Sequence, residues 1–322
     1  MNRFLWLGLA VLIVVLIWTG AWFAVAALVT TEVKALESAD GVTTPRVSCA
    51  QFGVSGYPFG IDVSCGGATI VTMDTTVSVD AIKATAQLYN PFHVLAFATG
   101  PVRVSDAFTG LSRRLDFKSL ELSARMNWFR VARVSVVGDS LVLNDTVLED
   151  RLIATADHVE AHLGDVASEY DAARHLVTLA QYATVTGLNA PGFEIENGTG
   201  IFDGKVSGLG DDVRLYGDAD VMRRWQAAGG VFTLNGFSGE DANSSFKSTG
   251  TLSLDSAGRP DGQFRIESKG VVEKIGRLFP GALPAWIVGA PAADGSYTQV
   301  INIQAGVVFA GLVPVAALGP AY

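Results

Sequence analysis

The chain has 322 residues, 49% of them hydrophobic, and its 23 Lys and Arg against 32 Asp and Glu give a net charge of −9. A negative chain without a cluster of basic residues repels phosphate backbones and anionic headgroups, which argues against nucleic-acid binding and against electrostatic adhesion to a membrane. Any contact with a bilayer must therefore come from an apolar segment.

The first element is an apolar segment at residues 4–29. Its 26 positions contain no charged side chain and would form a helix about 39 Å long. A bilayer core of roughly 30 Å needs about 20 residues, so the segment predicts one membrane-spanning helix that contacts lipid through residues 4–29. Signal sequences normally have an apolar stretch of about 7–15 residues. Although Ala24-Val25-Ala26 resembles a cleavage site, the length favours an uncleaved anchor.

Charges flanking this segment predict its orientation. Arg3 precedes it, and Lys34 follows it beside Glu32 and Glu37. Short basic tails stay in the cytoplasm, whereas long domains cross the membrane largely regardless of charge, so we expect most of the chain outside the cytoplasm. The predicted organisation is a tail, anchor and helical extension at 1–38, a linker at 39–45 and one β-rich domain at 46–322.

Cys49 and Cys65 are the only cysteines. Outside the cytoplasm such a pair favours a structural disulfide, because two thiolates cannot complete a four-ligand zinc site and this spacing is not a redox motif. If Cys49 lies directly opposite Cys65 in a hairpin, Ser55 pairs with Phe59 around the three-residue loop Gly56-Tyr57-Pro58. Directly opposed residues lie about 4.5 Å apart at Cα, within the range of a disulfide.

Alternation of apolar and polar residues dominates the rest of the chain. It predicts a mainly β fold, in which a large, curved, meander-rich antiparallel sheet follows the membrane helix and carries a few short helices. The alternating segments are residues 70–79, 116–124, 131–143, 231–234, 249–254 and 263–267.

Short helices are predicted at two places. Residues 218–228 begin with Asp218 as a cap and end at Gly229-Gly230, and residues 271–279 end at Pro280-Gly281. The pattern of residues 169–182 fits a helix and a strand equally well.

The four histidines raise the question of a metal site. On a helix, His158 and His162 would lie one turn apart, with His175 as a third zinc ligand. On a strand, His158, Glu160 and His162 share one polar face, and this interpretation agrees with the surrounding alternation. We therefore predict no metal, no cofactor and no catalytic residue. If the chain did bind a metal ion, its ligands would be His158, His162 and His175.

Other chemical motifs are incomplete. The Gly-rich sequences at 198–200 and 208–210 lack the third glycine of a dinucleotide loop and the Lys-Ser/Thr of a P-loop. The hydrophobic fraction instead leaves two alternatives open, an ordinary closed core or an apolar groove that suits acyl chains.

Several segments resemble a bacterial envelope family, chiefly from alphaproteobacteria, that is named as a domain of unknown function, DUF2125. Two of the resembling segments are GTLSLD at 250–255 and GRPDG at 258–262, and the most specific string is Leu-Asp-x-x-Gly-Arg-Pro-x-Gly at 254–262, whereas residues 311–320 follow the family pattern loosely. The other resembling segments are GYPF at 56–59 followed by Cys65, QLYNP at 87–91, GPV at 100–102 and WQAAGG at 225–230. The resemblance implies a single-pass bacterial inner-membrane anchor and a periplasmic domain, and it implies no enzymatic residues. The flanking charges place the N-terminus in the cytoplasm.

Taken together, these features predict a non-catalytic, inner-membrane-anchored periplasmic protein that binds or transfers lipid or supports envelope assembly. The expected partners are the bilayer and a lipid ligand or an envelope protein, and no nucleic acid. The alternative is a structural or protein-interaction module of the envelope, and a metal-dependent hydrolase that uses His158, His162 and His175 comes last.

Overall fold

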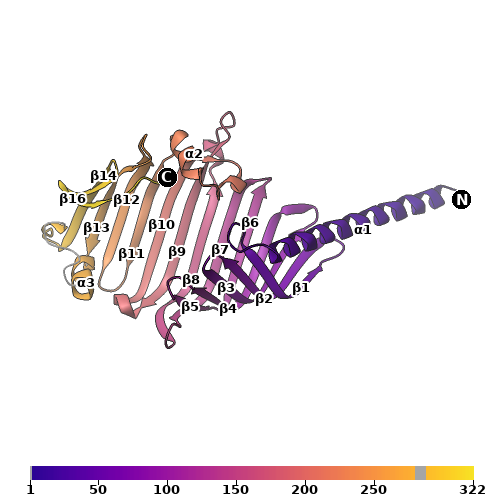
Figure 1. Cartoon of the computed structure of the whole chain (residues 1–322), viewed down its shortest axis with the longest axis horizontal. Helices are drawn as coiled ribbons and strands as arrows, with labels where there is room; N and C mark the ends of the chain where they lie inside the picture. Colours follow the sequence, from indigo (N-terminus) through magenta and orange to yellow (C-terminus); the bar gives the residue numbers. More distant parts are fainter. Residues whose placement is uncertain (1, 280–287) are drawn as a thin grey trace. The chain divides into compact units, whose positions relative to one another are not determined.

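The computed structural model describes residues 2–279 and 288–322. Within this part of the chain, sixteen strands form one sheet, accompanied by three α-helices (Figure 1). Successive strands pair as an antiparallel meander, and β6 leaves this path by pairing with β4 and β7. The structure thus confirms the predicted fold class.

The elements have the following bounds. The helices are α1 Asn2–Glu37, α2 Val221–Ala227 and α3 Val271–Leu278, with short 3-10 turns η1 Ala167–Glu169, η2 Pro191–Phe193 and η3 Val213–Leu215. The strands are β1 Arg46–Ser55, β2 Gly60–Thr72, β3 Thr75–Gln87, β4 Asn90–Asp106, β5 Ser112–Asp116, β6 Ser119–Asn127, β7 Arg130–Asp145, β8 Arg151–Asp165, β9 Leu176–Ala190, β10 Ile195–Gly210, β11 Phe232–Glu240, β12 Ser245–Leu254, β13 Pro260–Lys269, β14 Ser296–Gln304, β15 Val307–Ala310 and β16 Val313–Ala317.

The chain divides into two compact units. The N-terminal unit comprises Met1–Ala124 and Val142–Leu152, and the C-terminal unit comprises Arg125–Leu141 and Ile153–Tyr322. The assignment of residues 46–322 to a single domain stays a prediction.

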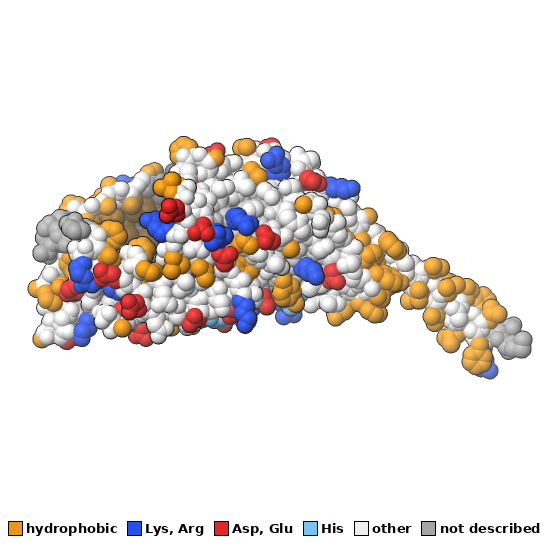
Figure 2. Space-filling view, turned by 90° about the horizontal axis from the view of Figure 1, so that it is seen from below, with side chains coloured by type: hydrophobic (Ala, Val, Ile, Leu, Met, Phe, Trp, Pro, Cys, Tyr) orange, Lys and Arg blue, Asp and Glu red, His pale blue; other side chains and the backbone are white. Residues whose placement is uncertain are grey.

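Helix α1 is the one helix of the described chain that is long and apolar enough to cross a membrane, a property that signal sequences share. Its residues 3–17 are exposed and extend beyond the strands, and hydrophobic side chains cover this part of the surface (Figures 1 and 2). From Trp18 onward, one face of the helix packs on the N-terminal unit. Trp22 and Ala26 are buried there against Ile61 of β2.

Two tryptophans fasten α1 to the turn between β1 and β2. The indole nitrogen of Trp18 donates to the carbonyl of Pro58 at 2.7 Å, and that of Trp22 donates to the carbonyl of Gly60, also at 2.7 Å. The hydroxyls of Thr19 and Tyr57 lie 2.9 Å apart in a further hydrogen bond. The turn and the helix are therefore held together by polar as well as apolar contacts.

The predicted disulfide is present, but the predicted hairpin register is wrong. Cys49 lies opposite Ala68 and Cys65 lies opposite Phe52, and the strands end at Ser55 and Gly60 around a four-residue connection. Gly67 has φ +60, and a Cβ atom there would come within 3.0 Å of the Cβ atom of Ala50 in β1. The register runs unchanged across Gly67, and the Cα atoms of the two cysteines, which are not directly opposed, lie 5.2 Å apart.

The short helices form close to where they are predicted. Helix α3 occupies most of 271–279, while the Pro280-Gly281 stop lies outside the described residues. Helix α2 begins later than expected, so the predicted cap at Asp218 is wrong, and its carboxylate instead accepts a hydrogen bond from Arg224. The ambiguous residues 169–182 are half strand, because β9 begins at Leu176, and the residues before it form the end of η1 and a turn.

Removing the disulfide by the pair Cys49→Ser and Cys65→Ser should lower the free energy of unfolding by about 3 kcal/mol, because the bridge closes a loop of 16 residues. Urea unfolding of the full chain in detergent measures this loss. Reduced wild-type protein should match the double variant. Labelling of unreduced, unfolded protein by a thiol reagent would contradict the assignment.

Candidate functional site

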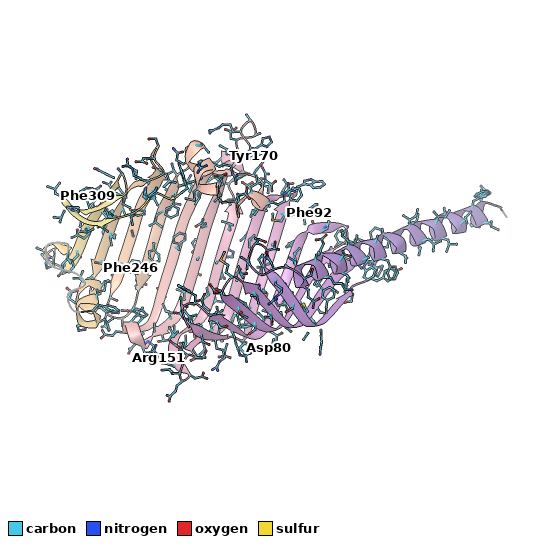
Figure 3. All side chains as sticks on the ribbon, viewed as in Figure 1. Asp80, Phe92, Arg151, Tyr170, Phe246 and Phe309 are labelled. Carbon is cyan, nitrogen blue, oxygen red and sulfur yellow. A yellow bond between two sulfur atoms is a disulfide. The ribbon has the colours of Figure 1, made fainter. Side chains whose placement is uncertain are left out.

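An apolar cavity of about 410 Å³ lies in the C-terminal unit between α3 and strands β9 to β12. Its size falls within the range of small-molecule sites, roughly 300–1,000 Å³. Phe237 and Phe246 line it from the strands, and Val271, Ile275 and Leu278 line it from the helix. Phe246 is labelled in Figure 3, where it comes from β12 beside α3.

The floor of the cavity is one row of residues across four paired strands. Val185 of β9 lies opposite Gly200 of β10, which lies opposite Gly239 of β11, which in turn lies opposite Phe246 of β12. A Cβ atom at Gly239 would come within 2.7 Å of the Phe246 ring, and one at Gly200 within 2.9 Å of Val185. The two glycines therefore leave the space in which the larger side chains of the row lie.

Helix α3 forms the roof because its apolar residues recur at one face. Val271, Ile275 and Leu278 are spaced by four and three residues, which places them on the same side of a helix. Phe237 and Phe246 pack edge to face below, with ring centroids 4.9 Å apart. Apolar groups from α3 and from the strands thus line the cavity on two sides.

One charged residue of α3 is buried beside this cavity. Lys274 donates to Asp241, in the turn between β11 and β12, at 2.5 Å and to the carbonyl of Glu194 at 2.9 Å. The exposed fractions of the Lys274 and Asp241 side chains are 10% and 5%. Burial raises the pKa of Asp241, but hydrogen bonds from Lys274, Asn243 and Ser244 outweigh it and hold the pKa at about 2. The Asp241 carboxylate therefore stays ionised at neutral pH, and its bond to Lys274 joins α3 to the turn between β11 and β12.

A polar cavity of about 1080 Å³ adjoins the apolar one and shares Ile195 and Lys274 with it. Its other lining side chains include amides and both signs of charge, among them Asn189, Asn197, Asn243, Glu273 and Arg277. A molecule with an apolar chain and a polar head would find both environments next to each other.

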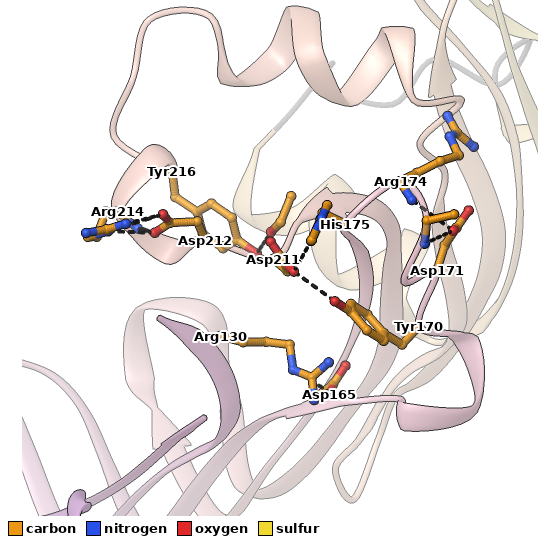
Figure 4. Close-up of polar contacts among 12 residues, drawn as sticks. Arg130, Asp165, Tyr170, Asp171, Arg174, His175, Asp211, Asp212, Arg214 and Tyr216 are labelled. Carbon is orange, nitrogen blue, oxygen red and sulfur yellow. Dashed lines mark hydrogen bonds and ion pairs between the residues drawn. The ribbon is translucent and has the colours of Figure 1, made fainter. Parts of the chain in front are cut away.

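A second cluster of polar side chains lies elsewhere in the C-terminal unit (Figure 4). The carboxylate of Asp211 accepts a hydrogen bond from the hydroxyl of Tyr170 at 2.9 Å and contacts Nδ1 of His175 at 3.2 Å. The guanidinium of Arg130 lies 4.4 Å from the Tyr170 ring centroid and 3.5 Å from the Asp165 carboxylate.

This cluster supports the fold. Tyr170 and Tyr216 pack against the buried side chains of Val131, Val177 and Leu179. The hydrogen bond to Asp211 raises the pKa of Tyr170, and burial, with Asp211 and Asp165 adding to it, raises the pKa of Tyr216 to about 12. Both phenols therefore stay protonated at neutral pH and act as hydrogen-bond donors.

The structure separates the three histidine metal candidates into two places. His158 and His162 lie on one face of β8, as the strand interpretation predicts, and each bonds a different oxygen of Glu160, at 2.8 and 3.1 Å. Their other ring nitrogens contact Asp139 and Ser135. His175 contacts Asp211 instead. Among the described residues, no group of three or more His, Cys, Asp or Glu is arranged to hold a metal ion.

An apolar groove was one of the two alternatives that the sequence leaves open, but the sequence predicts neither the place of this cavity nor the Lys274–Asp241 pair. One signal was available, because Lys274 interrupts the apolar face that Val271 and Ile275 define on the predicted helix. A charged side chain in such a stripe is buried only when it is paired. Its partner, in a turn 33 residues earlier, has no such signal.

Comparison with known families identifies the family to which the chain belongs. The sequence profile of a family described as "uncharacterized protein conserved in bacteria", DUF2125, matches residues 22–319. The chain belongs to the DUF2125 family. No curated protein and no solved structure matches it. The family match therefore begins inside α1, at the tryptophan that donates to Gly60, and covers both units of this DUF2125 protein.

Lys274→Met should lower the free energy of unfolding by about 3–5 kcal/mol, because it leaves the buried Asp241 carboxylate without its cation. Arg277→Met is the matched control on the same helix. Arg277 pairs with Glu194 at the exposed surface, where an ion pair contributes about 0–1 kcal/mol. Urea unfolding compares the two variants, and equal losses would contradict a special role for Lys274.

Glu160→Gln should lower the pKa of His158, which its hydrogen bonds to the carboxylates of Glu160 and Asp139 raise above 6.5. In the wild type this contribution to stability is complete below pH 6.5 and disappears as the pH rises through the higher pKa of the folded protein. The imidazole NMR signal of His158 reports the titration, with Glu196→Gln on β10 as the control. An unchanged titration in the Glu160 variant would show that the contact is absent in solution.

Proposed function

We propose that this DUF2125 protein is a bacterial inner-membrane protein with a cytoplasmic N-terminus, and that its β-rich part lies in the periplasm and binds lipid. In this proposal the acyl chain occupies the apolar cavity under α3, and the polar head lies in the adjoining cavity. The role is non-catalytic and consists of lipid binding or transfer, or of support for envelope assembly.

The observation that carries the proposal is the contact between an apolar and a polar cavity. The apolar cavity offers Phe237, Phe246 and Ile275 to a hydrocarbon chain, and the polar one offers amide and charged groups. Ligands enter sites where apolar walls surround a few convergent polar groups. An amphiphile matches both regions, whereas a wholly polar ligand would leave the apolar region unfilled.

Two further observations support the location. Trp18 and Trp22 of α1 are integral to the fold of the N-terminal unit, which favours retention of the apolar helix as an anchor over its removal as a signal sequence. The Cys49–Cys65 disulfide favours an oxidising compartment such as the periplasm. The charges that flank residues 4–29 favour a cytoplasmic N-terminus.

A protein-interaction module is the second candidate function. Strand β16, with the sequence VPVAA, is exposed along its length and pairs with β15 on one side of the described sheet. An exposed edge strand can accept a strand from another protein. Pro314 lacks an N–H donor, which restricts the ladder that such a partner could form.

Ile275→Trp should abolish lipid binding, because the larger side chain fills the space between α3 and the floor of the cavity. Gly276→Trp is the matched control. It introduces the same side chain at the next residue of α3, where an added Cβ meets open space. Native mass spectrometry of the full chain, extracted in detergent and incubated with a single-chain phosphatidylethanolamine, measures the bound lipid.

The wild type and the Gly276 variant should both carry one lipid, and the Ile275 variant should carry none. A wild-type mass without lipid, or equal lipid on all three proteins, would overturn binding in this cavity. In-cell crosslinking from β16 that gave one dominant protein adduct, combined with a lipid-free wild type, would favour the interaction module.

A further inference from the structure

The exposed part of α1 is too short to span a bilayer by itself. Residues 4–17 are 14 apolar or weakly polar positions that stand free of the strands, and they extend about 21 Å at 1.5 Å per residue. A bilayer core is roughly 30 Å thick, so about 9 Å of it remains to be crossed. Tilting the helix shortens its reach across the bilayer further.

The residues of α1 that follow position 17 must cross the remaining part of the bilayer core, and these residues are bonded to the β1–β2 turn. Trp18 and Trp22 donate to Pro58 and Gly60, and the ring centroids of Trp22 and Tyr57 lie 5.7 Å apart. A helix that crosses the core with these residues must place the turn at the depth of the lipid interface. The turn between β3 and β4 lies beside it, because the N–H of Leu88 donates to the carbonyl of Phe59 at 2.8 Å.

Both turns have the composition of a membrane-interface surface. Residues 47–61 and 84–102 contain no Lys, Arg, Asp or Glu. Tyr57 and Phe59 in the first turn are 50% and 61% exposed, and Tyr89 in the second is 74% exposed. Phe92 projects where β4 begins (Figure 3). Aromatic side chains of this kind concentrate at the boundary between lipid and water.

We infer that the β1–β2 and β3–β4 turns insert into the interface of the bilayer that α1 spans, with Tyr57, Phe59, Tyr89 and Phe92 in contact with lipid. The N-terminal unit then contacts the membrane directly at a fixed depth, and is not attached to it only through a flexible linker. The face of α1 from Trp18 to Val29 that packs on the strands is turned away from lipid. This inference rests on the proposal that α1 spans a membrane, and it is independent of lipid in the cavity under α3.

Photocrosslinking tests the inference in the full chain, reconstituted into vesicles of phosphatidylethanolamine and phosphatidylglycerol. p-Benzoylphenylalanine replaces Phe59, Tyr89, Leu12 or Phe108 in four separate variants. Leu12 lies in the exposed part of α1 and reports whether the helix is in the bilayer. Phe108 is the matched control, since it is an 85% exposed aromatic residue just beyond the opposite end of β4. Mass spectrometry identifies the adducts, and an intact Cys49–Cys65 disulfide verifies folding of each variant.

Lipid adducts at positions 12, 59 and 89, with none at 108, are the expected result. Lipid at 12 alone would overturn the docking of the turns and leave the anchor intact. Equal lipid at all four positions would overturn a specific interface, as would a protein adduct that replaced lipid at 59. No lipid at 12 would overturn the membrane-spanning role of α1 and this inference with it.

Discussion

Each of the three α-helices in the described part of the chain is held to the strands or to their connecting turns by a buried or partly buried side-chain nitrogen that donates to a backbone carbonyl. Trp18 and Trp22 do this for α1, Trp225 for α2 through the carbonyl of Ser207, and Lys274 for α3. Sixteen hydrophobic residues of the described chain are buried, which is a small core for a sheet of this size. Backbone hydrogen bonds hold the strands together, and the side-chain bonds to backbone carbonyls fix the position of each helix. The position of α3 creates the apolar cavity, and the position of α1 places it against the β1–β2 turn.

Much of the fold could be predicted because its signals are local. The apolar run of α1, the alternation of the strands and the Gly-terminated pattern of α2 each appear within a short window of sequence. The disulfide was predictable from the expected compartment and the cysteine count, but the strand register was not. That register depends on where the connection closes, and the strands end around residues 56–59, one residue more than the predicted loop Gly56-Tyr57-Pro58. Asp218 is not the cap because α2 begins only at Val221, and its carboxylate accepts a hydrogen bond from Arg224 instead.

The candidate site was less predictable than the fold because it is built from distant residues. The row that forms its floor takes one residue from each of β9, β10, β11 and β12, and only the strand registers bring them together. Gly200 and Gly239 look like ordinary turn-favouring residues in the sequence, yet both lie inside strands. The buried ion pair joins α3 to a turn 33 residues earlier. Periodicity can identify an apolar helix face, but it cannot say what that face covers.

The docking of α1 also bears on how the protein would mature. Ala24-Val25-Ala26, which resembles a signal-peptidase site, is helical here, and Ala26 is buried against β2. A protease acts on chain that has locally opened, so its rate follows the population of the open form once the domain has folded. Folding of the N-terminal unit therefore competes with processing, and the tryptophan contacts favour the outcome in which the helix is kept. If α1 is an anchor, as we propose, its retention depends on the rate of folding of the N-terminal unit as well as on the length of the apolar segment.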